Sequence, residues 1–357
     1  MILDFLIDKL IETTYPSMDN SKCLNVIRNG QCNKCAEICP KKAIKLDNSK
    51  FHIDKDLCNN CEVCIAVCPT QSIYMKTLSE EKLIRLSNDK RNPVFCCNLS
   101  GAKGNMVISC LNAIHPELLA VLFILYKDKK FYFNLSKCKD CELKLDYLFK
   151  ESLNQALEFT RLLDIEPNYK LLSDEKSIND LCEEVVSRRE LFQLLKKNST
   201  NAASNTLRTI IIDDENKLSI REYLLRVIKD KDLNIPIVND FFNFYNVSND
   251  CTGCGQCERK CPSHAWKVEE NNNTITIFHN AGMCFKCGIC IDECPHKAIK
   301  RSFSQSKEVL DYKIKNIIEL KTCHSCRKKF IPSSHNQEKC EICIKKEALR
   351  KKIASSN

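Results

Sequence analysis

Glycine is scarce in this chain: it occurs 7 times in 357 residues and never in a G-x-G-x-x-G turn or a P-loop. The sequence therefore indicates no bound nicotinamide, flavin or nucleoside triphosphate. Long apolar runs are missing too, because the longest, around residues 118–125, is well short of the ~18 residues that a membrane-spanning helix needs. The N-terminal stretch MILDFLIDKLIE has neither the positively charged region nor the cleavage site of a signal peptide. We therefore expect no membrane span and a cytoplasmic location.

Cysteine, by contrast, is abundant, with 26 in the chain, so metal sites or disulfides must account for most of it. A disulfide framework suits short secreted domains, whereas the reducing cytoplasm keeps thiolates free for metals. The formal net charge of +9 would by itself favour an anionic partner. An iron–sulfur cluster or a zinc ion held by four thiolates carries about −2, however, so several of them would offset this charge. We therefore expect metal binding, and nucleic acid is disfavoured as a partner.

Most of the cysteines follow one spacing. Residues 251–262 (CTGCGQCERKCP), 284–295 (CFKCGICIDECP) and 58–69 (CNNCEVCIAVCP) each read C-x₂-C-x₂-C-x₃-C-P. This run of thiolates is the one that holds [4Fe–4S] clusters in two-cluster ferredoxins. After the fourth cysteine the chain reads proline, two variable residues, a small residue and an apolar one, which indicates internal duplication. Alternating apolar residues around a turn predict a β-hairpin within each half, over residues 44–53 and 266–277.

The first motif, QCNKCAEICP, departs from this pattern because Asn29 stands where the first cysteine should be. Cys23 lies upstream in a C-x₈-C-x₂-C-x₃-C-P pattern, so a longer loop could bring it in as the fourth ligand. The alternative is a site with three thiolates that holds a [3Fe–4S] or labile cluster, with Cys23 a buried small hydrophobic residue. The sequence leaves both interpretations open.

Residues 23–75 and 249–300 each resemble the bacterial two-[4Fe–4S] ferredoxin domain. The resemblance implies crossed ligation, in which three cysteines of one motif share a cluster with the fourth cysteine of the other. It also implies that these small domains fold only with metal bound. The implied ligands are Cys23, Cys32, Cys35 and Cys68 for the first cluster; Cys39, Cys58, Cys61 and Cys64 for the second; Cys251, Cys254, Cys257 and Cys294 for the third; and Cys261, Cys284, Cys287 and Cys290 for the fourth.

Between these halves lies a cysteine-rich stretch with a different pattern. It predicts strands over residues 94–96, 107–110 and 130–135 and a helix over 116–126, which together indicate a small α/β unit with a parallel sheet. Its cysteines fall at or just past the predicted strand ends, where open α/β sheets place their sites. Three interpretations remain: zinc or a [2Fe–2S] cluster, a redox dithiol, or buried strand residues beside an unused C-x₂-C. The residues concerned are Cys96, Cys97, Cys110, Cys138 and Cys141, of which all but Cys96 are the candidate metal ligands.

The C-terminal stretch contains two C-x₂-C knuckles separated by 13 residues, which is the spacing of a Cys₄ zinc ribbon. Mononuclear iron is the alternative occupant. We expect His324 and His335 to face solvent, the basic tail to be a solvated helix face, and Cys182 to be structural. The predicted ligands are Cys323, Cys326, Cys340 and Cys343.

The expected fold class is a multidomain α+β protein in which two dicluster domains flank an α/β unit and a helical segment. The segments are residues 1–80 (first dicluster domain), 90–145 (cysteine-rich α/β unit), 146–240 (helical segment), 241–303 (second dicluster domain) and 304–357 (zinc-ribbon-like segment with a basic tail).

A chain with four [4Fe–4S] clusters, zinc and no organic cofactor is best interpreted as a polyferredoxin-like electron carrier or redox subunit. We expect its partners to be redox proteins, a donor and an acceptor. Two alternatives remain: an iron–sulfur oxidoreductase that uses the central cysteines, and a redox-sensing regulator that binds nucleic acid through the ribbon and the basic tail.

Overall fold

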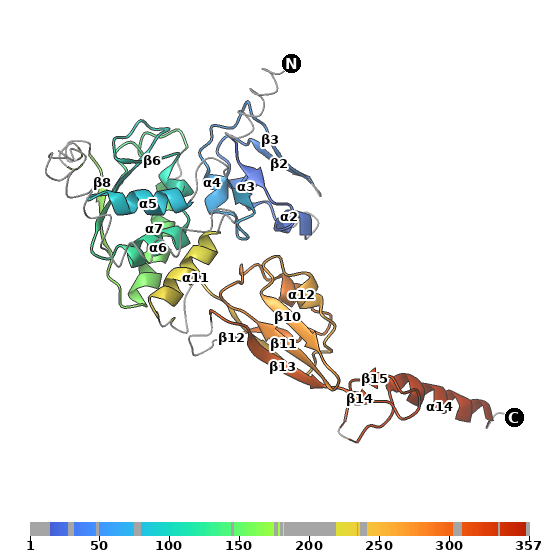
Figure 1. Ribbon diagram of the computed structural model, residues 1–357. Helices are drawn as coiled ribbons and strands as arrows, with labels where there is room; N and C mark the ends of the chain where they lie inside the picture. Colours follow the sequence, from blue (N-terminus) through green and yellow to red (C-terminus); the bar gives the residue numbers. More distant parts are fainter. Residues whose placement is uncertain are drawn as a thin grey trace, which may run out of the picture. The chain divides into compact units, whose positions relative to one another are not determined.

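The computed structural model describes residues 15–27, 32–47, 50–74, 80–143, 146–174, 178, 181, 219–233, 235, 241–302, 309–334 and 336–354 (Figure 1). These residues form two compact units, one within residues 1–241 and the other within residues 242–354. Among them, no helix is long and apolar enough to cross a membrane. Cys182, His335 and Asn29 lie outside the described residues.

The first dicluster region consists of short elements around the cysteine loops. The predicted hairpin over residues 44–53 is confirmed as β2 and β3, which pair Ile44 with Ile53 across the ladder. A second antiparallel pair, β1 with β4, joins the beginning of the region to its end. The elements are β1 (Ser17–Met18), α2 (Leu24–Ile27), α3 (Lys34–Ile38), β2 (Ile44–Asp47), β3 (Lys50–Ile53), α4 (Val63–Ala66) and β4 (Ile73–Tyr74).

The central unit contains a four-stranded sheet in the order β6-β5-β7-β8, and every neighbouring pair is parallel. The parallel sheet predicted for this stretch is thus present. Its fourth strand, however, comes from the segment expected to be helical, and that expectation is wrong for residues 168–172. Only Leu172 of that strand is buried, so its sequence lacks the apolar alternation that would have marked it. The strands are β5 (Val94–Cys97), β6 (Met106–Ile108), β7 (Lys130–Asn134) and β8 (Asn168–Leu172).

Helix α6 (Pro116–Leu125) is the core helix of this unit. Its sequence PELLAVLFIL is apolar on every side, and all residues from Glu117 to Ile124 are buried. His115 caps its N-terminus, because the ring Nδ1 accepts a hydrogen bond from Glu117 N–H at 3.2 Å. α6 packs against α7 (Asp146–Arg161) and α11 (Ile220–Asp230), while α5 (Glu80–Asp89) and the 3₁₀ turn η1 (Leu111–Ala113) complete the unit.

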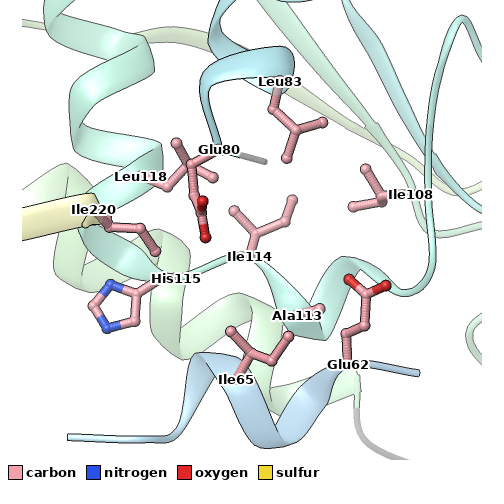
Figure 2. Close-up of a pocket in the computed structure, with 10 residues that line it drawn as sticks. All are labelled: Glu62, Ile65, Glu80, Leu83, Ile108, Ala113, Ile114, His115, Leu118 and Ile220. Carbon is pink, nitrogen blue, oxygen red and sulfur yellow. The ribbon is translucent and has the colours of Figure 1, made fainter. Parts of the chain in front are cut away.

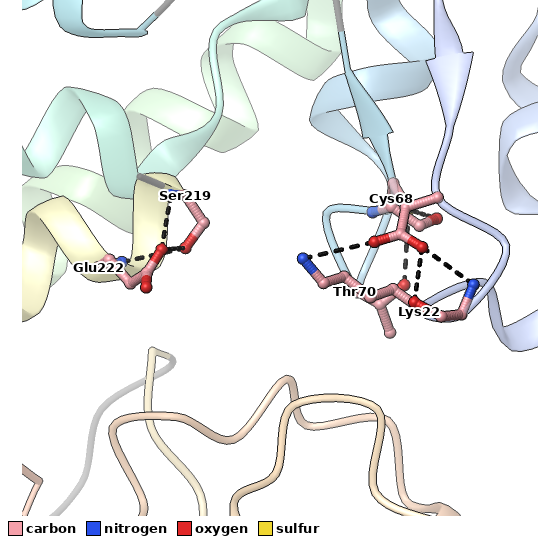
Figure 3. Close-up of polar contacts among 8 residues, drawn as sticks. Lys22, Cys68, Thr70, Ser219 and Glu222 are labelled. Carbon is pink, nitrogen blue, oxygen red and sulfur yellow. Dashed lines mark hydrogen bonds and ion pairs between the residues drawn. The ribbon is translucent and has the colours of Figure 1, made fainter. Parts of the chain in front are cut away.

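Helix α11 lies within the segment expected to be helical, residues 146–240, and is amphipathic. It begins at a capping box in which Ser219 and Glu222 each bond the other's backbone N–H (Figure 3). Arg221 forms a buried ion pair with Glu117 of α6 and donates to the carbonyl of Phe241 at 2.9 Å.

In the second unit the hairpin predicted over residues 266–277 is confirmed as β10 (Trp266–Glu270) and β11 (Thr274–His279). A third strand, β13 (Lys313–Glu319), pairs antiparallel with β11 and was not predicted. It is an edge strand whose Ile314 and Ile317 are exposed, so its burial pattern gives no clear signal. The remaining elements are β9 (Phe244–Val247), α12 (Gln256–Arg259), α13 (Ile289–Asp292), β12 (Ile299–Ser302), β14 (Lys321–Thr322), β15 (Lys329–Phe330) and α14 (Glu341–Ala354).

Candidate metal centres

The three complete cysteine loops share an unusual backbone. The residues two and four positions after the first cysteine of each loop have positive φ, in the left-handed region. Alternating turns of this kind direct successive backbone N–H groups into the loop, where they can stabilise negative charge on sulfur. Glycine adopts this conformation without strain and fills both positions in one loop. The residues are Asn60 and Glu62, Gly253 and Gly255, and Lys286 and Gly288.

The fourth cysteine of every motif, including the first, accepts a hydrogen bond from the backbone N–H of the residue four positions later. The N···S distances are 3.3 Å to Cys39, Cys68 and Cys261 and 3.4 Å to Cys294. The residue before each donor has a φ of 50–53°, which turns the N–H back toward the sulfur. The donors are buried, and this explains why small residues recur there: they are Ala43, Ser72, Ala265 and Ala298.

The four cysteines assigned to the first cluster, including Cys23, line one cavity. The pKa of Cys35 is raised to about 12, first by burial and then by the nearby thiols of Cys68, Cys23 and Cys32. Four thiols that share one buried space suit a cluster, because metal binding removes their protons and neutralises their charge. Thr70 and Ser72 lie beside Cys68, with Thr70 Oγ1 at 3.8 Å and Ser72 Oγ at 3.1 Å from its sulfur.

Cys23 reaches this cavity from a separate segment just before α2, and only 7% of its surface is exposed. The loop that lacks the first cysteine also lacks the usual backbone: Asn33, four positions after Asn29, has a φ of −132°. The equivalent residues of the other loops have φ values of 62°, 71° and 78°. The first loop thus differs in conformation as well as in sequence, and a thiol from elsewhere lies beside the other three.

The thiols assigned to the second cluster also lie together. Burial raises the pKa of Cys64 well above its ordinary value, and the nearby thiols of Cys61, Cys35, Cys58 and Cys39 add to the shift. The thiols that raise the pKa of Cys61 are Cys39 and Cys58. Cys39 comes from the first motif, so its nearness to Cys61 agrees with the crossed ligation that the ferredoxin resemblance implies.

The second unit repeats this arrangement. Cys251, Cys254, Cys257 and Cys294 line one cavity. Burial raises the pKa of Cys257 to about 12, with the thiols of Cys251 and Cys254 nearby. The pKa of Cys290 is raised by burial and then by Cys284, Cys287 and Cys261, which are the other ligands assigned to the fourth cluster.

Beside the fourth site lies an aromatic group that sequence reasoning did not single out. The ring of Trp266 is 4.5 Å from that of His279 and 5.7 Å from that of Tyr245. All three are at most 2% exposed, and the Trp266 side chain lies close enough to Cys290 to lower the pKa of that thiol. Burial lowers the pKa of His279 to about 3, with Lys315 adding to the shift, so the protein groups alone favour a neutral ring. Hydrogen bonds to ligand sulfur are one of the features that set a cluster's potential.

The four cysteines of the C-terminal knuckles have sulfur atoms within 4.8 Å of one another. Four sulfurs in a tetrahedron around zinc, each about 2.3 Å from the ion, lie about 3.8 Å apart. The distance between Cys326 and Cys340 sulfurs is 3.8 Å. The backbone N–H of Cys340 donates to Cys323 Sγ at 3.3 Å and, with the N–H groups of Cys326 and Ser325, lowers the pKa of that thiol to about 6. His324 faces solvent as expected, 63% exposed beside Glu338.

The central cysteines separate into two groups. Cys96 is fully buried, and its thiol lies 3.8 Å from the carbonyl of Met106. Cys97, the next residue of β5, faces the opposite side of the sheet and shares a buried group with Cys110. The neighbouring groups of Cys110 and Ser100 hold the pKa of the Cys97 thiol below its ordinary value, whereas the pKa of Cys110 is raised. Cys141 packs against this pair, and Cys138 lies in the same turn as Cys141.

Paired cysteine loops with crossed thiols define the class of dicluster iron–sulfur proteins. Comparison with known families agrees, since residues 30–72 and 250–299 each match a family described as a 4Fe-4S dicluster domain. The chain is 31% identical over 77 residues to an uncharacterized ferredoxin of Methanocaldococcus jannaschii, which covers 92% of that protein and 20% of this chain. It is 33% identical over 61 residues to a ferredoxin of Methanothermococcus thermolithotrophicus, covering 95% of that protein and 17% of this chain.

A third relative is the pyruvate synthase subunit PorD of Methanocaldococcus jannaschii, 39% identical over 62 residues, with 65% of that subunit and 17% of this chain covered. The chain belongs to the 4Fe–4S ferredoxin family, and it carries the dicluster domain twice. Its role is iron–sulfur electron transfer, as in a polyferredoxin.

Proposed function

We propose that this chain is a multi-centre electron relay with four [4Fe–4S] clusters, two in each dicluster domain. Each cluster takes three cysteines of one motif and the fourth cysteine of the other, and Cys23 completes the first cluster. The cavity that Cys23 shares with Cys32, Cys35 and Cys68 is the observation that carries this assignment. The grouping of Cys39 with the second motif and of Cys261 with Cys290 supports the crossed arrangement.

The clusters would supply one-electron chemistry, and the chain would hold them at set positions and adjust their potentials. The backbone N–H groups directed at the fourth cysteines stabilise negative charge on those sulfurs and so favour the reduced state. Among these fourth cysteines Cys68 is buried and the other three are partly buried, which would limit the access of solvent to the clusters. The donor and acceptor are proposed to be redox proteins, and the protein is proposed to work in the cytoplasm, where thiols stay reduced.

The C-terminal ribbon is proposed to hold one zinc ion for a structural purpose. Its four thiols occupy all positions of a tetrahedral site, so none is left open for a substrate. The close spacing of its sulfurs supports a single ion rather than a cluster.

The test is a reductive titration of the full-length chain, purified without oxygen and followed by visible absorbance and EPR. We expect uptake of about four electrons per chain with [4Fe–4S] signals, because each such cluster accepts one electron. Oxidation by an added one-electron acceptor should restore the starting spectrum, while protein stripped of iron should take up none. Irreversible bleaching, or uptake without [4Fe–4S] signals, would contradict the relay.

A further inference from the structure

We propose that Cys97, Cys110, Cys138 and Cys141 hold a [2Fe–2S] cluster next to the second cluster site of the first domain. This inference rests on the electron-relay function and adds to it a fifth redox centre, built by the central sheet. Three chain segments supply the cysteines: the end of β5, the turn after β6 and the turn after β7. In a parallel sheet these segments meet at one edge.

Strand geometry selects which cysteines belong to the site. Cys96 lies beneath Gly104, where a side chain on the glycine would meet the Cys96 sulfur at 2.8 Å, and it is sealed in the core. Cys97 is on the other face of β5, toward Cys110. Consecutive strand residues point to opposite faces, so the two neighbouring cysteines cannot share one site. Four thiols therefore remain, and none of them is in a disulfide.

A hydrogen-bond donor points at one of these sulfurs, as donors do at the ferredoxin ligands. Asn112 Nδ2 donates to Cys110 Sγ at 3.4 Å. The ligand thiols of the dicluster motifs accept N–H bonds of similar length, 3.3–3.4 Å.

The arrangement of the cysteines favours two irons over one ion. Within the described part of the chain, the ribbon is the sole group of three or more such ligands gathered within 4.8 Å. The central cysteines instead come as two pairs. Cys97 and Cys110 share one buried group, and Cys138 and Cys141 share a turn in which Cys141 N–H donates to Cys138 O at 3.3 Å. Two thiolates for each of two irons is the ligand set of a [2Fe–2S] cluster.

The site faces the second cluster of the first domain. Cys61 belongs to the same buried group as Cys97 and Cys110, and Ile38, next to Cys39, packs against that group. Ser109 donates to Glu62 Oε1 at 2.6 Å, while the carbonyl of Ser109 lies 3.2 Å from Cys97 Sγ. Lys41 and Glu142 form a further link at 3.2 Å. Figure 2 shows the same boundary, where Glu62 and Ile65 face Ala113 and Ile114 across a small cavity. Electrons on the second cluster therefore have a direct route to this centre.

The test compares two double variants, Cys97→Ser with Cys110→Ser and Cys138→Ser with Cys141→Ser, against Cys96→Ser in the full-length chain. Cys96→Ser removes a buried thiol from the same strand without touching the site. Wild type and Cys96→Ser should contain about two more iron and two more sulfide than either double variant, with a [2Fe–2S] Mössbauer and EPR signal that the double variants lack. The second double variant alters a partly exposed turn, which guards against loss of folding.

Equal iron content and the same spectra in wild type and both double variants would overturn the proposal. So would the loss of zinc instead of iron, or the appearance of a reducible Cys97–Cys110 disulfide in iron-replete wild type. The [4Fe–4S] signals are read in the same samples. If they persist while the [2Fe–2S] signal is missing from wild type, this inference fails and the electron relay stands; if they are missing, the relay itself fails.

Discussion

The hairpin of the first dicluster domain pairs Ile44 with Ile53, whereas the second pairs Trp266 with His279 at the same place. Ile44 and Trp266 each follow a buried alanine whose N–H donates a hydrogen bond to the fourth cysteine of the motif. The loops are thus repeated, but the side chains behind them are not. A repeated loop can build the same cluster site twice, while the residue one step beyond it gives each site its own environment.

The two domains also differ in what is attached to them. The first packs its second cluster loop against the central sheet through Cys61, Val63 and Glu62. The second adds β13 to its hairpin and continues into the ribbon. A cluster loop of the first domain therefore lies beside the central thiols.

The largest effect is expected from removing Cys23 in the first domain or Cys251 in the second. Each is proposed to complete one cluster of its domain, but Cys251 lies within its cysteine loop whereas Cys23 lies upstream of its loop. Cys23→Ser and Cys251→Ser should each convert one cluster to a three-iron form, with a loss of about one iron per chain and a new [3Fe–4S] EPR signal. Both variants should also lose stability, because cluster binding and folding are coupled. Iron analysis and EPR of oxidised protein measure this, with Cys96→Ser as the control. If Cys23→Ser protein has the iron content and EPR spectrum of wild type while Cys251→Ser protein does not, Cys23 is not a cluster ligand equivalent to Cys251.

A smaller effect, on the reduction potential of the fourth cluster, is expected from changing Trp266, which pairs with His279 where the first domain pairs Ile44 with Ile53. Trp266→Phe keeps an aromatic ring against His279 and Tyr245 but removes the indole N–H from Cys290. Loss of this bond should make the potential of the fourth cluster about 20–60 mV more negative, since such bonds favour the reduced state. EPR-monitored redox titration measures the shift. The control is Ile44→Val, at the equivalent place in the first domain, which should leave the potential of the fourth cluster unchanged. A Trp266→Phe protein whose fourth cluster keeps the wild-type potential would show that the Trp266 ring acts by packing alone.

Local patterns in the sequence were enough to predict three features. Cysteine spacing predicted the cluster loops, apolar alternation around a turn predicted both hairpins, and strands alternating with a helix predicted the parallel sheet. The crossed grouping came from resemblance, since spacing alone does not say which thiols meet across a fold. The faces of Cys96 and Cys97 could have been separated from sequence, because neighbouring strand residues alternate. The serine–glutamate spacing at Ser219 was likewise readable as a capping box.

Other features of the fold could not be predicted from the sequence. Strands β8 and β13 are edge strands with exposed apolar residues, so the sheet decides their pairing rather than their own pattern. The left-handed φ of Lys42, Gln71, His264 and Lys297 was not evident because these residues share no side-chain chemistry. Cys61 and Cys97 belong to one buried group although their segments are far apart in sequence, and only the folded chain reveals this grouping.

The most direct measurement is Mössbauer spectroscopy of ⁵⁷Fe-labelled full-length protein purified without oxygen, together with iron, sulfide and zinc analysis. The account predicts about 16 iron in [4Fe–4S] form and about one zinc per chain, with about two further iron in [2Fe–2S] form. A [3Fe–4S] component with about 15 cubane-type iron in freshly prepared wild type would contradict it, because Cys23 would then not complete the first cluster.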